Sequence, residues 1–162
     1  MLPVGQPALR AARVFALAVP GALLGGAYVS EYGFGLFPCE MCWWQRYAHF
    51  AALAFALIAV AAPRRRAPVA LAALAIAVSA LIGLFHAGVE YHWWEGFTAC
   101  TSTARLGGGN PLDAIMAAPL IRCDTPQWTF AGVSLAGFNF ICSGLGAVLV
   151  AVLLGNSRKG AA

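Results

Sequence analysis

Residues 39–62 read CEMCWWQRYAHFAALAFALIAVAA, two cysteines followed directly by an apolar run. From Trp43 to Ala62 this run contains one charged residue, Arg46. An α-helix of about 20 residues is roughly 30 Å long, which is the thickness of the hydrocarbon core of a bilayer. The run is therefore predicted to form a transmembrane helix with a C-x-x-C motif at its N-terminal end.

Three further apolar stretches indicate a membrane protein with four transmembrane helices. The predicted spans cover residues 14–29, 43–62, 69–89 and 130–154. Hydrophobic residues make up 61% of the 162 residues and charged residues only 10%, whereas soluble domains carry about 25% charged residues. The runs are continuous and lack the alternation of a transmembrane β-strand. We expect an all-α membrane protein, a four-helix bundle that forms a single domain over residues 1–162.

The distribution of charge predicts how the bundle lies in the membrane, because basic residues near the ends of spans mark the cytoplasmic side. Seven of the ten basic residues share one side: Arg10, Arg13, Arg64, Arg65, Arg66, Arg158 and Lys159. All six acidic residues share the other: Glu31, Glu40, Glu90, Glu95, Asp113 and Asp124. Both termini are therefore expected in the cytoplasm, with the cysteine-bearing loops on the opposite face.

The N-terminal segment has an alternative interpretation. Two arginines before an apolar run also resemble a secretory signal peptide, whose removal would leave three spans. We favour an N-terminal segment that is retained in the protein, because a first span over residues 14–29 satisfies the charge bias of every loop at once.

The longest connection covers residues 90–129, on the side of the acidic residues. Within it, Pro111 suits the first position of a helix, and apolar residues follow at helical spacing. We expect a short amphipathic helix over residues 111–121 that lies at the membrane surface. Long loops of this kind are usually functional.

Four of the five cysteines form two pairs in the outer loops. Cys39 and Cys42 make the C-x-x-C motif, and Cys100 and Cys123 lie in the long loop. Cys42 is the expected thiolate, because it stands at a helix N-terminus, which favours negative charge. Arg46 lies one turn later on the same helix face and adds to this effect. Two such pairs can pass a disulfide from one to the other by thiol exchange.

Other polar residues in or beside the spans are candidates for a site. His86 ends the third span, with Glu90 one turn on, and could carry a proton or donate a hydrogen bond to a ligand. His49, about two turns below Cys42, is expected to form hydrogen bonds between helices. Cys142, inside the last span, is expected to pack in the core as a small apolar residue.

Two interpretations without exchange chemistry stay open. Both cysteine pairs could be structural disulfides, although a bridge within C-x-x-C closes too small a ring to constrain the chain much. The four thiolates could instead hold zinc, although structural zinc sites usually offer two C-x-x-C motifs. A non-enzymatic metal-binding or structural membrane protein is therefore the alternative to a redox enzyme.

The pattern C-x-x-C-x-x-x-R at residues 39–46 resembles the signature of the DsbB family, the bacterial inner-membrane disulfide bond formation protein B. A second match is RCDTPQWTF at residues 122–130, directly before the last span. The four spans and two outer cysteine pairs extend the resemblance over nearly the whole chain. The vitamin K epoxide reductase family shares four helices and paired cysteines, but it places its C-x-x-C late in the chain.

The resemblance implies a protein-dithiol:quinone oxidoreductase of the bacterial inner membrane, with periplasmic cysteine loops. Such an enzyme reoxidises a periplasmic thioredoxin-like partner of the DsbA type and passes the electrons to ubiquinone or menaquinone. The implied catalytic residues are Cys39, Cys42, Cys100 and Cys123, and no metal is implied.

The resemblance also implies an order of events. The partner attacks a Cys100–Cys123 disulfide at Cys100, Cys123 then joins Cys39, and Cys42 is freed to donate to the quinone. Arg46 would stabilise negative charge on the quinone ring. The implied quinone-binding residues are Cys42, Arg46, His86 and Glu90.

Overall fold

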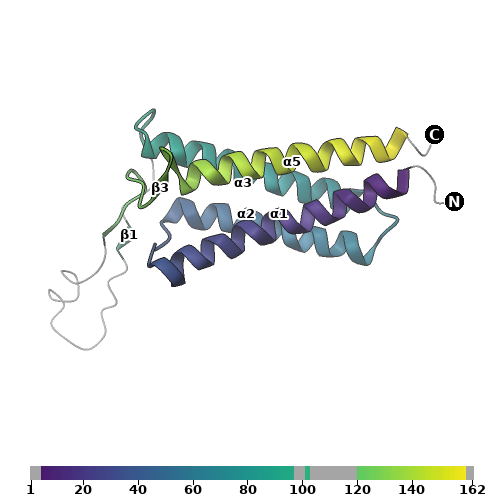
Figure 1. Ribbon diagram of the computed structural model, residues 1–162, viewed down its shortest axis with the longest axis horizontal. Coiled ribbons are helices and arrows are strands. Elements are labelled where there is room, and N and C mark those ends of the chain that lie inside the picture. Colours follow the sequence, from purple (N-terminus) through teal and green to yellow (C-terminus); the bar gives the residue numbers. More distant parts are fainter. Residues whose placement is uncertain (1–4, 97–100, 103–119, 160–162) are drawn as a thin grey trace.

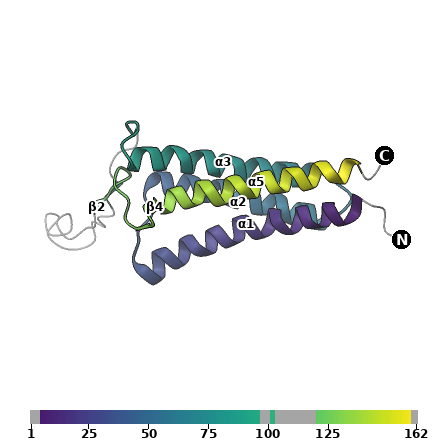
Figure 2. The same cartoon turned by 45° about the horizontal axis from the view of Figure 1, so that its top comes forward.

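The computed structural model describes residues 5–96, 101–102 and 120–159 (Figure 1). Four long α-helices lie side by side within these residues: α1 (Gly5–Phe34), α2 (Glu40–Ala61), α3 (Ala67–Glu90) and α5 (Leu135–Lys159). This arrangement confirms the predicted all-α bundle of four helices. Both termini lie at one end, and the short strands lie at the other (Figures 1 and 2).

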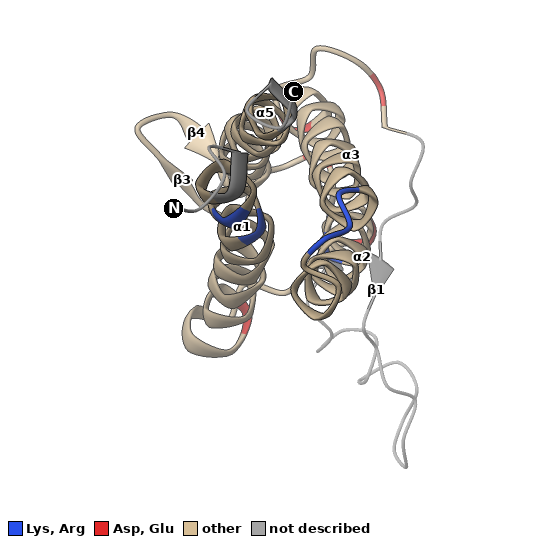
Figure 3. Cartoon of the chain, turned by 90° about the vertical axis from the view of Figure 1, so that its right-hand side faces the viewer, with Lys and Arg blue, Asp and Glu red and all other residues tan. Residues whose placement is uncertain are grey.

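The helices form a ring in which each packs against two neighbours. Seen from the end that holds the termini, α2 and α5 each lie between α1 and α3 (Figure 3). Basic residues of α1 and of the turn between α2 and α3 lie at this end. The guanidinium of Arg66 donates a hydrogen bond to the carbonyl of Ser157, 2.9 Å away, and so ties that turn to the end of α5.

Side chains are distributed as a lipid environment requires. Within the described residues, three segments are long and apolar enough to cross a membrane: Pro7–Phe34, Ala67–Glu90 and Leu135–Ser157. The first half of α2, which begins at Glu40, is more polar than these three segments, but Gln45, Arg46 and His49 are buried inside the bundle. Large apolar side chains of α2 face outward instead: Phe50, Leu57, Ile58 and Val60. Polar groups inside and apolar groups outside reverse the pattern of a soluble protein.

The bounds of α1 and α5 differ most from the predicted spans. α1 extends from Gly5 to Phe34, and Pro20 lies buried inside it without ending it. α5 begins at Leu135, five residues later than predicted, because a hairpin of β3 (Thr129–Phe130) and β4 (Val133–Ser134) precedes it. Gly132, at φ 78°, adopts the left-handed conformation in the turn of this hairpin, which glycine adopts at little cost.

The long loop is described only in part. β1 (Thr101–Ser102) pairs antiparallel with β2 (Leu120–Ile121), with Thr101 opposite Ile121. The amphipathic helix predicted over residues 111–121 lies outside the described residues, apart from Leu120 and Ile121, which form β2. Cys100 also lies outside them.

Small residues allow the helices to approach closely. A Cβ atom added to Gly83 of α3 would lie 3.0 Å from the carbonyl oxygen of Ala136 and 3.0 Å from the backbone nitrogen of Phe140, both in α5. Neither backbone atom can move without shifting α5. Close approach at glycine is typical of helix contacts in membranes.

We predict that Gly83→Ala destabilises the bundle by about 1–3 kcal/mol, because the added methyl overpacks the contact between α3 and α5. Gly144→Ala is the matched control, since a Cβ atom there meets nothing within 4 Å. The free energy of unfolding of both variants can be measured by titration with SDS. Equal stability of the two variants would contradict the prediction.

Candidate functional site

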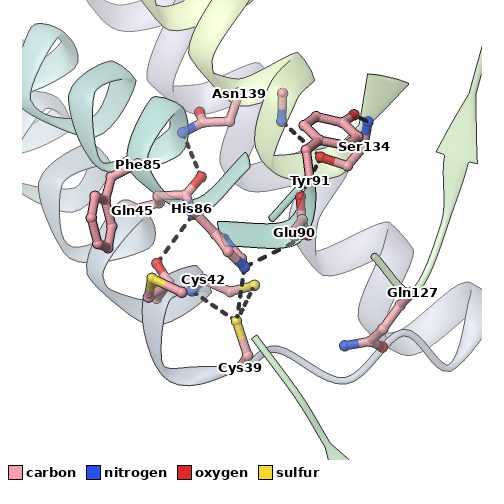
Figure 4. A network of polar contacts seen from close by, with 12 residues as sticks. Cys39, Cys42, Gln45, Phe85, His86, Glu90, Tyr91, Gln127, Ser134 and Asn139 are labelled. Carbon is pink, nitrogen blue, oxygen red and sulfur yellow. Dashed lines mark hydrogen bonds and ion pairs between the residues drawn. The ribbon is translucent and has the colours of Figure 1, made fainter. Parts of the chain in front are cut away.

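The C-x-x-C motif begins helix α2. Cys39 is the N-cap residue, and its Sγ accepts a hydrogen bond from the backbone nitrogen of Cys42 at 3.3 Å. The two sulfurs are 2.9 Å apart (Figure 4). Cys39 is buried and Cys42 is half-buried. A disulfide between them needs only a small approach of the two sulfurs.

Cys123 of the long loop reaches the same sulfur. Cys123 is buried, and Sγ of Cys39, Sγ of Cys123 and a ring nitrogen of His86 all lie within 4.8 Å of one another. Hydrogen bonds with Cys123 and Cys42, together with burial, raise the pKa of the Cys39 thiol. Cys39 is therefore protonated at neutral pH when it is reduced. The structure thus brings three of the four predicted catalytic cysteines together, and the fourth, Cys100, lies outside the described residues.

Residues close to Cys123 in the sequence hold this part of the long loop beside the start of α2. The side-chain nitrogen of Gln127 donates to the carbonyl of Phe37 at 2.6 Å, which links the loop to the connection before α2. Arg122 and Asp124, on either side of Cys123, form an exposed ion pair. The hydrogen bond from Arg122 lowers the pKa of Asp124 to about 2, so Asp124 is charged throughout the physiological range.

His86 of α3 faces the sulfurs with one ring nitrogen and α2 with the other. Its Nε2 lies 3.6 Å from Sγ of Cys39 and 3.6 Å from Oε1 of Glu90. Its Nδ1 lies 3.0 Å from the side-chain nitrogen of Gln45. Glu90 also accepts a hydrogen bond from the hydroxyl of Ser134. His86 and Glu90 are both buried, and both lie beside the thiols.

The residues that support these groups were missed by sequence reasoning. Asn139 of α5 donates to Oε1 of Gln45 at 2.7 Å and to the carbonyl of Ser79 at 3.1 Å. Its Oδ1 lies 2.9 Å from Nε2 of His49, which confirms that His49 forms hydrogen bonds between helices. Polar residues inside apolar spans were the available signal, because such residues are costly in a membrane and usually functional.

Arg46, the residue after Gln45 in α2, points toward α1. It is buried, and its Nη1 is 2.5 Å from Oε2 of Glu31. Its Nη2 donates to the carbonyl of Ala27 at 3.2 Å. The guanidinium carbon lies 4.9 Å from the ring centres of both Tyr28 and Trp43, a cation–π arrangement. Glu31 was not among the predicted site residues.

A cavity of about 250 Å³ opens beside Cys42 and is lined by residues of all four long helices, α1, α2, α3 and α5. The four residues predicted to hold a cofactor all line it: Cys42, Arg46, His86 and Glu90. Apolar side chains form much of the remaining wall: Leu24, Leu36, Phe37, Trp128, Leu135 and Phe138. The common location supports one site, and the binding of a cofactor by these residues stays a prediction.

The prediction that Cys142 packs in the core was wrong. Its side chain is exposed on the outer surface of α5, and the next residue, Ser143, is the buried one. The apolar run alone does not indicate which face of a membrane helix points inward, because both faces are apolar.

Fold and site together define a helical membrane protein whose buried thiols border an apolar cavity. The sequence model of the family "Disulfide bond formation protein DsbB" matches residues 9–153. A relative named disulfide bond formation protein B, from Aromatoleum aromaticum, is 32% identical over 157 residues, covering 88% of this chain and 90% of the relative. Another, from Shewanella sp. (strain MR-4), is 32% identical over 139 residues, covering 82% and 78%.

Disulfide bond formation protein B 1 of Pseudomonas putida is also 32% identical, over 144 residues and 85% of each chain. No solved structure matches this chain. The chain belongs to the DsbB family, whose members are oxidoreductases that generate disulfides.

We predict that Glu31→Gln destabilises the bundle by about 3 kcal/mol, because it leaves the buried guanidinium of Arg46 without its counter-charge. Glu40→Gln is the matched control, since Glu40 is exposed at the start of α2. The free energy of unfolding of both variants can be measured in detergent, with unfolding followed by circular dichroism. A loss of stability no larger than that of the control would show that Glu31 does not stabilise Arg46.

Proposed function

We propose that this protein oxidises the dithiol of a periplasmic thioredoxin-like partner of the DsbA type and passes the electrons to a membrane quinone. One observation carries the proposal: the sulfur of Cys39 lies between Cys123, from the outer loop, and Cys42, which lines the cavity. Neighbouring sulfurs can move a disulfide by successive exchange. The partner is itself a strong oxidant, near −120 mV, so its reoxidation needs a stronger acceptor.

The first exchange takes place in the long loop. The thiolate of the partner attacks the Cys100–Cys123 disulfide at Cys100, a mixed disulfide forms, and Cys123 leaves as a thiolate. Cys123 then attacks the Cys39–Cys42 disulfide at Cys39, so that a Cys39–Cys123 bond forms and Cys42 leaves as a thiolate. The second partner thiol attacks the mixed disulfide, which releases an oxidised partner and reduced Cys100. Cys100 then attacks the Cys39–Cys123 bond at Cys123, so that the Cys100–Cys123 disulfide re-forms and Cys39 leaves as a thiol. The reduced pair Cys39 and Cys42 is left to be reoxidised to a disulfide.

The cavity fits a quinone ring in size and chemistry. A cavity of about 150 Å³ holds a benzene ring, and this cavity measures about 250 Å³ with largely apolar walls. A bound quinone, ubiquinone or menaquinone, supplies an acceptor for the two electrons and two protons that the cysteines release. Cys42 presents its sulfur to that space, and Arg46 places a positive charge there, held in position by Glu31.

The measurement that tests this function is quinone reduction by the purified protein, driven by a reduced thioredoxin-like donor. We expect turnover by the wild type, and loss of it to the rate without protein in Cys42→Ser and Cys100→Ser, because each breaks one exchange step. Cys142→Ser is the control, since its exposed sulfur lies on the outer surface of α5. Absence of turnover with either quinone, together with stoichiometric zinc, would favour the metal-binding alternative.

The same proposal places the cysteine end of the bundle in the periplasm and both termini in the cytoplasm of a bacterial inner-membrane protein. Its support is the set of basic residues at the end that holds the termini. We predict that alkaline phosphatase, which is active only outside the cytoplasm, is inactive when fused after Ala162 and active when inserted after Glu95. Activity of the fusion after Ala162 would reverse the proposed orientation.

A further inference from the structure

The hydrogen bonds of Gln45 determine which nitrogen of His86 carries a proton. The side-chain nitrogen of Gln45 lies 3.1 Å from the backbone carbonyl of Met41, which can only accept. The NH₂ group of Gln45 is therefore on this side, and the same group lies 3.0 Å from Nδ1 of His86 (Figure 4). A nitrogen that faces an NH₂ donor must accept, so Nδ1 is unprotonated and the proton of the neutral ring is on Nε2.

A second backbone carbonyl leads to the same assignment. The side-chain nitrogen of Asn139 lies 3.1 Å from the carbonyl of Ser79, which fixes the orientation of this amide. The same nitrogen donates to Oε1 of Gln45 at 2.7 Å, which fixes the orientation of Gln45. The backbone carbonyls of Met41 in α2 and Ser79 in α3 thus fix the side-chain amides of Gln45 and Asn139. The oriented amide of Gln45 in turn determines the tautomer of His86.

The Nε2–H group lies beside the reacting sulfurs and beside Glu90. Nε2 is 3.6 Å from Sγ of Cys39 and 3.6 Å from Oε1 of Glu90, and Sγ of Cys123 is within 4.8 Å. When Cys123 attacks Cys39 and Cys42 leaves, one negative charge moves across three sulfurs. A donor fixed beside such a path stabilises the charge in the transition state.

We propose that Gln45 is a positioning residue that keeps His86 neutral with its proton on Nε2, so that His86 donates a hydrogen bond to the sulfurs during exchange. The inference rests on the proposed function for its consequence, but the tautomer itself follows from the hydrogen bonds. It assigns His86 a role toward the thiols, in addition to its place on the cavity wall.

The same hydrogen bonds disfavour a metal ion at this cluster. Cys39, Cys123 and His86 are spaced as ligands for a thiophilic cation. A metal would need the lone pair of Nε2, which carries the proton in this tautomer. The amide of Gln45 would have to turn over and lose its hydrogen bonds to Met41 and Asn139.

The test is the ¹⁵N spectrum of the reduced protein labelled at its three histidines, with His86 assigned by His86→Phe. We expect wild-type His86 to show the neutral Nε2–H form. Gln45→Glu should shift it to a form protonated on Nδ1, because a carboxylate accepts a proton there. Ser143→Ala is the matched control: Ser143 donates to Oδ1 of Asn139, away from Gln45, and its loss should leave the His86 signal unchanged.

The rate of partner oxidation gives the second readout. We expect both Gln45→Glu and Gln45→Leu to slow it about tenfold or more, as loss of an aligned donor does, and Ser143→Ala to change it less than twofold. A wild-type His86 that is cationic or protonated on Nδ1 overturns the proposal, as do Gln45 variants that keep both tautomer and rate. The correct tautomer in a protein without turnover would overturn the proposed function and leave the tautomer assignment intact.

Discussion

The site depends on the hydrogen bonds of one half-buried amide, Asn139. The bilayer core offers no water to polar groups, so each must find partners inside the bundle. Asn139 satisfies this requirement for three helices at once, because it contacts Gln45 and His49 of α2 and Ser79 of α3 from its position on α5. The register of these helices is thereby fixed at the depth of the site. Apolar contacts alone specify register weakly, since lipid competes for them equally.

Much of the fold could be predicted because the bilayer leaves few alternatives. Continuous apolar runs of sufficient length predicted the helices, and the C-x-x-C motif predicted where the thiols meet α2. The start of α5 could not be predicted, because Phe130 and Val133 are apolar in a hairpin as they would be in a span. The prediction that Cys142 packs in the core failed for a similar reason. Composition gives the length of a membrane helix but does not show which of its faces points inward.

The sequence predicted the reactive residues of the candidate site but not the residues that support them. Cys39, Cys42 and Arg46 belong to a recognisable spacing, whereas Glu31 and Asn139 are single polar residues distant in sequence from the motif. Their contacts join residues 15 and 94 positions apart, and such pairs follow only from the packing of whole helices. The structure shows that Arg46 is already paired with Glu31, so a ligand in the cavity meets a guanidinium whose orientation is fixed.

Two consecutive residues of α2 divide the chemistry of the site. Neighbouring residues on a helix point about 100° apart, so Gln45 faces α3 and α5 while Arg46 faces α1. On the proposed function, Gln45 controls the donor beside the exchanging sulfurs, and Arg46 controls the charge beside Cys42 at the cavity. Each half-reaction thus has its own polar partner on the same rigid element. The C-x-x-C pair at the start of α2 joins the two half-reactions, because the sulfurs of Cys39 and Cys42 are only 2.9 Å apart.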